Sequence, residues 1–131
     1  MRILGIDYGR RKIGLAVGDI ESKLAEPYRV ISFETIGEAL KKIEKETEKE
    51  KIEKIVVGVS EGEMAEETKK FGKKLEDKLG ISVVFQDETL TTYEAQRFSI
   101  EAGIKRKKRK ELEDAYSAAL ILQEYLDSHG N

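Results

Sequence analysis

The chain has 131 residues and carries 24 lysines and arginines against 26 aspartates and glutamates, which gives a formal net charge of −2. This length suits one domain with a modest core, and the absence of cysteine excludes disulfide frameworks and zinc–thiolate sites. No apolar run is long enough to span a membrane, and the N-terminus reads as a strand rather than a signal peptide, so we expect a cytoplasmic protein that contacts no membrane.

The N-terminal part of the chain begins with three strand patterns. Apolar residues dominate positions 2–7, alternate with small residues over 12–19, and recur over 28–33 after the only proline, Pro27. Short turns join these three patterns. They therefore predict an antiparallel meander.

The rest of the chain alternates between helical and strand patterns. The predicted elements are helices at 36–51, 63–79, 92–102 and 109–126 and strands at 52–59 and 81–85. After the meander, this order predicts an α/β fold in which a mixed five-stranded sheet has helices on both faces, the layout of the ribonuclease H-like fold. We expect one such domain over residues 1–127, followed by a short disordered tail at 128–131.

Acidic residues stand at the ends of three predicted elements. Asp7 ends the first strand, Asp87 and Glu88 follow the fifth, and Asp114 lies near the start of the last helix. Each has an ordinary explanation, because aspartate commonly begins turns and acids favour helix N-termini. Asp114, however, projects near apolar positions, where a carboxylate needs a partner, a metal or water. Because the three sites can converge on one edge of the sheet, together they favour a metal site.

Four blocks along the chain resemble the YqgF/RuvX family, a group of RuvC-like nucleases with a ribonuclease H-like fold. The resemblance runs from the first strand to Leu126, and the four blocks in this order are far more specific than any one of them. The blocks are residues 5–9 with 13–17, 56–58, 87–92, and 114–119 with 121–123.

The resemblance implies a metal-binding catalytic set made of Asp7, Glu88 and Asp114, served by Mg²⁺ or Mn²⁺. Asp87 also matches a family acid, but adjacent strand residues point to opposite faces, so we rank Asp87 below Glu88. Metal ions in such a set activate a water and stabilise the leaving oxygen of a phosphodiester. The only histidine, His129, lies in the expected tail, so metal-activated water fits the chain better than a histidine base.

Basic residues near these acids are the candidate nucleic-acid contacts. Arg10, Arg11 and Lys12 follow Asp7, where they either screen phosphates or are solvated turn residues. Six consecutive basic residues at 105–110 lie between the last two predicted helices and just before Asp114. They could follow a phosphate backbone, although most such runs are flexible surface segments. The candidate contacts in this run are Lys105, Arg106, Lys107, Lys108 and Arg109.

The resemblance implies a metal-dependent nuclease that hydrolyses phosphodiester bonds, and we favour processing of the 5′ end of precursor 16S ribosomal RNA during ribosome biogenesis. The alternative is a Holliday junction resolvase acting in DNA recombination and repair. A resolvase must present two active sites in a stable dimer, and no dimerisation segment is evident in the sequence. We therefore expect a monomer or weak dimer that binds structured RNA or branched DNA.

Two features depart from the family pattern. Thr89 stands where the family usually has arginine, and residues 58–63 form a short acidic segment where the family has a longer polar loop. These departures keep open a non-catalytic RNA-binding protein with a vestigial site. The Asp-x-Gly segment at 7–9 also resembles the phosphate loop of actin- and hexokinase-type kinases, but those enzymes need two such domains and this chain has room for one.

Overall fold

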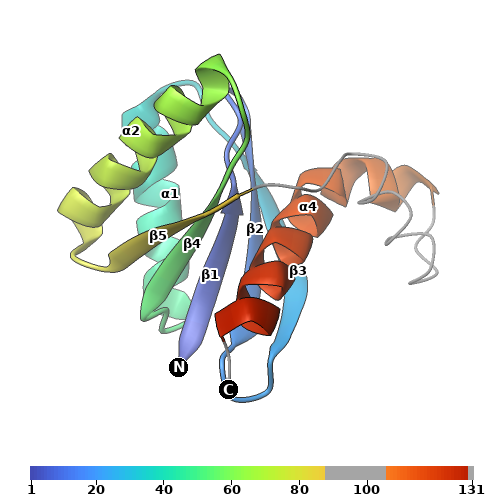
Figure 1. Ribbon diagram of the computed structural model, residues 1–131. Coiled ribbons are helices and arrows are strands. Elements are labelled where there is room, and N and C mark those ends of the chain that lie inside the picture. The colour runs from blue at the N-terminus through green and yellow to red at the C-terminus, as the bar shows by residue number, and fades with distance from the viewer. Residues whose placement is uncertain (88–105, 130–131) are drawn as a thin grey trace.

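A computed structural model describes residues 1–87 and 106–129 (Figure 1). Five strands form one sheet in the order β3-β2-β1-β4-β5, in which β1–β2 and β2–β3 pair antiparallel and β1–β4 and β4–β5 pair parallel. The elements are β1 (Arg2–Asp7), β2 (Lys12–Asp19), β3 (Leu24–Ser32), α1 (Ile36–Lys49), β4 (Lys54–Val59), α2 (Glu63–Leu79), β5 (Ser82–Asp87) and α4 (Arg106–His129). The predicted mixed sheet is therefore present; the helix expected at 92–102 lies outside the described residues.

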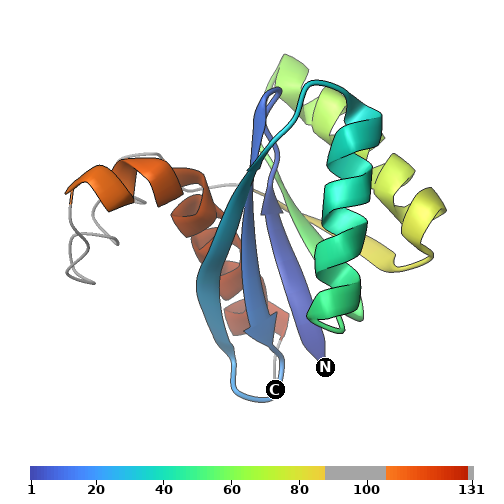
Figure 2. The ribbon, with the colours of Figure 1, turned by 180° about the vertical axis from the view of Figure 1, so that it is seen from behind.

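Helices cover both faces of the sheet (Figures 1 and 2): α1 and α2 lie on one face, and α4 lies on the other. Alternation along the strands divides the core, because successive side chains of a strand point to opposite faces. The core under α1 and α2 includes Leu4, Ile6, Ile13, Leu15, Val57, Ile43 and Leu75. The core under α4 includes Ile3, Ala16, Val56, Ala118, Ile121, Leu122 and Leu126.

Strand β3 begins four residues earlier than expected and contains Pro27 in its interior. Pro27 lies opposite Ala16, where the pairing register shifts between Leu15 and Ala16. A proline, which has no N–H to donate, is tolerated in an edge strand or at a bulge, and β3 is an edge strand at such an irregularity. The expected start at residue 28 was wrong for this reason.

Helix α4 extends beyond the predicted range of 109–126 at both ends. The Ser128 hydroxyl donates a hydrogen bond of 2.9 Å to the Glu124 carbonyl, and the His129 ring stacks on Tyr125 at 4.3 Å between centroids. Ser128 and His129 are therefore helical, which corrects the expectation of a disordered tail from residue 128. Among the described helices, none combines the length and apolar character needed to cross a membrane.

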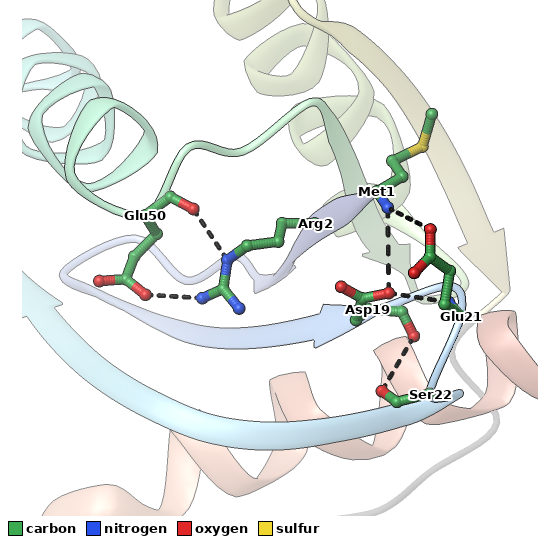
Figure 3. Close-up of polar contacts among 6 residues, drawn as sticks. All are labelled: Met1, Arg2, Asp19, Glu21, Ser22 and Glu50. Atoms are coloured by element: carbon green, nitrogen blue, oxygen red, sulfur yellow. Dashed lines mark hydrogen bonds and ion pairs between the residues drawn. The ribbon is translucent and has the colours of Figure 1, made fainter.

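Ion pairs lie at the end of the sheet where β1 begins (Figure 3). The Arg2 guanidinium donates to the Glu50 carboxylate at 2.7 Å and to the Glu50 backbone carbonyl at 2.9 Å. The Met1 ammonium lies 3.9 Å from the Asp19 carboxylate and 3.8 Å from that of Glu21. A cavity of about 270 Å³ adjoins these groups. It lies at the opposite end of β1 from Asp7, so it is no part of the predicted metal site.

Candidate active site

Asp7 is the last residue of the central strand β1 and is half-buried. Strand alternation places it on the α4 face: Gly5, two residues earlier, approaches Leu122 of α4, whereas Ile6 belongs to the core under α1 and α2. Because β1, β4 and β5 run parallel, their carboxyl ends meet at the same edge of the sheet. Asp7 thus lies at the carboxyl end of the parallel strands, on the face of the sheet that α4 covers.

Asp114 of α4 lies near Asp7 because the backbone of α4 packs on Gly14. In the pairing of β1 with β2, Gly14 lies opposite Asp7. The backbone of α4 passes directly over Gly14, such that a Cβ atom built there would lie 1.9 Å from the Asp114 carbonyl oxygen. Two aspartates that are far apart in the sequence therefore both neighbour Gly14. This arrangement is compact enough for the two residues to belong to one site.

The electrostatic setting of Asp114 suits a bound cation. The residue is half-buried, and burial raises the pKa of its carboxyl group because the charged form loses hydration. The Lys12 ammonium, at the start of β2, lowers the same pKa. Positive charge near Asp114 thus favours its ionised form. The carboxylates of Asp7 and Asp114, both half-buried, are the hard oxygen donors that Mg²⁺ and Mn²⁺ prefer, so the donor chemistry fits a divalent cation.

The predicted third ligand, Glu88, lies outside the described residues, as does Thr89. Within residues 1–87 and 106–129, no group of three or more histidine, cysteine, aspartate or glutamate side chains is arranged to hold a metal ion. Asp7 and Asp114 are therefore the only members of the predicted set Asp7, Glu88 and Asp114 that the structure describes. Any third carboxylate has to come from beyond residue 87.

Asp87 lies on the other face of the sheet by strand alternation. Phe85, two residues earlier, faces α2, because a Cβ atom at Gly72 of α2 would lie 2.6 Å from its ring. Val84 packs instead against the core under α4. Asp87 ends β5, is exposed, and follows Phe85 in the alternation. It thus points away from the face that Asp7 and Asp114 share.

The loop after Asp7 is fixed to helix α2 by one carboxylate, that of Glu67. The Tyr8 hydroxyl donates to Glu67 Oε1 at 3.1 Å, and Arg10 Nε donates to Glu67 Oε2 at 3.0 Å. The Tyr8 ring also stacks on Phe71 at 4.6 Å between centroids. Burial, followed by the Glu67 contact, raises the pKa of Tyr8 to about 12. Sequence reasoning missed Glu67, because nothing distinguishes it from the other glutamates of a Glu/Lys-rich helix.

The predicted basic contacts fall into separate groups. The Arg10 side chain is exposed and paired with Glu67, so a phosphate would have to compete with that carboxylate. The Arg11 and Lys12 side chains are exposed, while the Arg11 carbonyl accepts a hydrogen bond of 3.0 Å from the Phe33 amide. In the basic run, Lys105 lies outside the described residues. The backbone of the other four candidates belongs to the start of α4, which leads to Asp114: Arg106, Lys107, Lys108 and Arg109.

Known proteins of one family match this chain over nearly its whole length. The family model described as "RuvX: Holliday junction resolvase" matches residues 1–128. A protein of Caldanaerobacter subterraneus subsp. tengcongensis, named "Putative pre-16S rRNA nuclease", is 44% identical over 138 residues that cover 100% of this chain and 99% of the relative. A protein of the same name from Halothermothrix orenii is 41% identical, with 97% and 95% covered.

Solved structures show the fold independently. RuvC of T. thermophilus in complex with a Holliday junction substrate matches with a TM-score of 0.64 and 16% identity, covering 98% of this chain and 94% of that chain. The Fowlpox virus resolvase in complex with Holliday junction DNA also gives 0.64, with 14% identity and 98% of both chains covered. At these identities the likeness concerns the fold alone, and it confirms the predicted ribonuclease H-like architecture.

Proposed function

The chain belongs to the RuvX family, and on this premise we propose that it is a nuclease that hydrolyses phosphodiester bonds with the help of a divalent cation. The observation that carries the proposal is that Gly14 pairs with Asp7 and lies directly under the backbone of Asp114. Two half-buried carboxylates supplied by a strand and a helix are donors that suit a divalent cation. The match to the RuvX family model supports the same use of these residues.

Each residue of the proposed site has a distinct task. Asp7, on a strand, and Asp114, on a helix, would hold the cation between two rigid elements, with Glu88 as the third ligand. When bound, the cation supplies an activated water and stabilises the leaving oxygen. Lys12 favours the ionised form of Asp114 before the cation arrives. The Arg11 side chain, which is exposed and follows Asp7 by four residues, would contact phosphate.

The proposed substrate is the 5′ end of precursor 16S ribosomal RNA, which the names of the curated relatives support. We place this activity in the cytoplasm and assign it to a monomer or weak dimer that uses Mg²⁺ or Mn²⁺. The second candidate is a branched DNA junction, which the RuvC and Fowlpox virus complexes favour. A junction resolvase would require a stable dimer with two sites, so the mass of the protein in solution separates the two.

A cleavage assay with purified protein tests the proposal. Three substrates of matched length are incubated with Mg²⁺ or Mn²⁺: precursor 16S rRNA carrying its 5′ extension, unstructured single-stranded RNA, and a four-way DNA junction. We expect metal-dependent cleavage of the precursor and loss of that cleavage with chelator. Preferential, symmetric cleavage of the junction would establish the resolvase instead. RNA binding without cleavage of any substrate would indicate a non-catalytic binding protein.

The adjacent pair Asp87 and Glu88 offers an internal test of the metal site. Asp87 lies on the face opposite Asp7 by strand alternation. We expect Glu88→Gln to reduce cleavage much more than Asp87→Asn, since each substitution removes one negative charge but only one removes a ligand. Equal rates for the two variants, or the reverse order, would show that the acid of the other face serves the metal.

A further inference from the structure

Four glycines lie where α4 packs on the sheet, and what each contacts differs. A Cβ atom at Gly5 would meet Leu122 Cβ at 2.8 Å, and one at Gly58 would meet Ile121 Cδ1 at 2.5 Å. At Gly18 it would meet the Leu24 carbonyl oxygen of the neighbouring strand at 2.9 Å. At Gly14 all three nearest atoms belong to the backbone of α4: the Asp114 carbonyl oxygen and carbon, at 1.9 and 2.2 Å, and the Ala115 nitrogen, at 2.8 Å.

A side chain at position 14 could therefore be accommodated only by moving the backbone of α4. A side chain such as Ile121 can change rotamer, but a helix carbonyl moves only with its helix. Cβ atoms essentially never approach another atom within 3.0 Å, so an alanine at 14 would require a shift of about 1.1 Å, the difference between 3.0 and 1.9 Å. The displaced segment of α4 is the one that carries Asp114.

The far end of α4 is held independently. Gln123 Oε1 accepts a hydrogen bond of 3.0 Å from the Ala25 amide, and Gln123 Nε2 donates to the Lys23 carbonyl at 2.8 Å. These bonds tie the helix to the β2–β3 turn. A side chain at position 14 would consequently tilt the Asp114 end of the helix away from β2 rather than shift the whole helix.

We propose that Gly14 is a positioning residue for the nuclease reaction, because its missing side chain sets the distance at which the Asp114 carboxylate meets Asp7. The inference rests on the proposed function, since it assigns a role to Gly14 through Asp114. It deepens that function by identifying what fixes the spacing of two cation ligands. Asp7 lies on β1 and Asp114 on α4, and Gly14 of β2, which pairs with Asp7, is where the backbone of α4 at Asp114 contacts the sheet.

Mn²⁺ affinity, measured by electron paramagnetic resonance without substrate, tests this role apart from activity. We expect Gly14→Ala to weaken Mn²⁺ binding by about 10- to 100-fold, the range typical of residues that orient metal ligands. Gly5→Ala is the matched control, because it also crowds α4 but at Leu122 Cβ and the Ala118 carbonyl oxygen, one to two turns from Asp114. It should lower the melting temperature by less than Gly14→Ala does and leave Mn²⁺ affinity within about threefold. Equal Mn²⁺ affinity in the two variants would overturn the proposal.

Lengthening the carboxylate gives a rescue that a purely structural role would not produce. Asp114→Glu adds one carbon–carbon bond of about 1.5 Å. In the unchanged chain it should weaken Mn²⁺ binding, because the backbone is already at closest approach. In the Gly14→Ala background it should restore much of the lost affinity. Should Gly14→Ala fail to fold, Asp114→Glu alone decides: unchanged Mn²⁺ affinity would mean that the spacing is not critical.

The outcome also separates this inference from the proposed function. If Asp114→Asn binds Mn²⁺ and cleaves nucleic acid normally, Asp114 is no ligand and the proposed site itself is wrong. If Asp114→Asn is inactive while Gly14→Ala binds Mn²⁺ normally, the site stands and only the role of Gly14 is overturned.

Discussion

The two faces of the sheet are packed by different means. Under α1 and α2, branched aliphatic side chains of the strands and of the helices share one core, to which Leu15 and Leu75 belong. Under α4, glycines such as Gly5 and Gly14 let the backbone of the helix approach the strands. Side-chain packing keeps helices apart from a sheet and buries apolar surface, whereas backbone packing brings a helix close. Both faces bury an apolar core, but only the face with the close helix carries Asp7 and Asp114, so we expect the placement of charge to be a task of that face alone.

The largest predicted effect is a loss of cleavage activity with no loss of stability. Asp7→Asn should abolish metal-dependent cleavage, because it removes a ligand charge at the α4 face. It should leave the melting temperature unchanged or raise it, since it relieves repulsion between carboxylates. Cleavage assays and thermal unfolding measure the two quantities. Asp19→Asn is the control, because Asp19 ends β2 at the opposite edge of the sheet (Figure 3) and should change cleavage little. Normal turnover of Asp7→Asn would refute the metal site.

The converse effect, a loss of stability with no loss of activity, is expected for the face under α1 and α2. Leu75 is fully buried there, and Leu75→Ala should lower the free energy of unfolding by about 2–5 kcal/mol through lost burial and the cavity left behind. Urea denaturation gives this free energy, and kcat is measured where the variant is folded. We expect kcat per folded molecule to stay near its original value. A kcat that fell as steeply as the stability would mean that the two faces do not divide these tasks.

A smaller effect is expected for the basic run that precedes Asp114. We predict that neutralising Lys105, Arg106, Lys107 and Lys108 to glutamine raises KM and reduces the salt dependence of binding, by up to about one unit of slope per lost phosphate contact. Turnover at saturating substrate should change little, because the carboxylates remain. The matched control removes the same charge from the exposed surface of α2: Lys69, Lys70, Lys73 and Lys74. Similar losses in the two quadruple variants would mean that general attraction, not a defined surface, holds the substrate.

The smallest predicted effect is an alkaline loss of stability that originates under α1 and α2. The pKa values of Tyr8 and Tyr28 are each raised to about 12, first by burial and then by the Glu67 and Glu46 carboxylates. Because the unfolded phenols ionise near pH 10, this contribution is complete below pH 10 and is lost as pH rises toward 12. Tyr8→Phe should therefore flatten the fall in stability between pH 10 and 12, and adding Tyr28→Phe should flatten it further. An unchanged profile in urea titrations would contradict this assignment.

Local patterns predicted much of this architecture because they act over a few residues. Strand β2 and helix α2 have the expected bounds, since alternation of Ile13, Leu15 and Val17 identifies a strand and Gly80, at φ 67°, ends a helix. The interior position of Pro27 was not predictable, because it depends on the irregularity opposite Ala16 in another strand.

For the candidate site, the sequence predicts the acids and their chemistry, but it does not predict how the fold brings them near one another. The sequence identified Asp7 and Asp114 as acids at element ends, and the structure brings both to Gly14. That Gly14 is the point of contact depends on the docking of α4, which no local pattern encodes. The role of Glu67 likewise depends on the packing of α2 against the loop that carries Tyr8. The predicted ligand Glu88 stays a prediction.

The proline inside β3 has a consequence for how molecules of this protein meet. An edge strand exposes unpaired amides and carbonyls that can template a strand from another molecule. Pro27 has no amide to offer a second strand, the pairing is irregular beside it, and the nearby Glu26 and Arg29 side chains are exposed and charged. Growth of the sheet from one copy into the next is thereby discouraged at β3. We expect Pro27→Val to increase aggregation on heating while leaving cleavage by the native molecule unchanged.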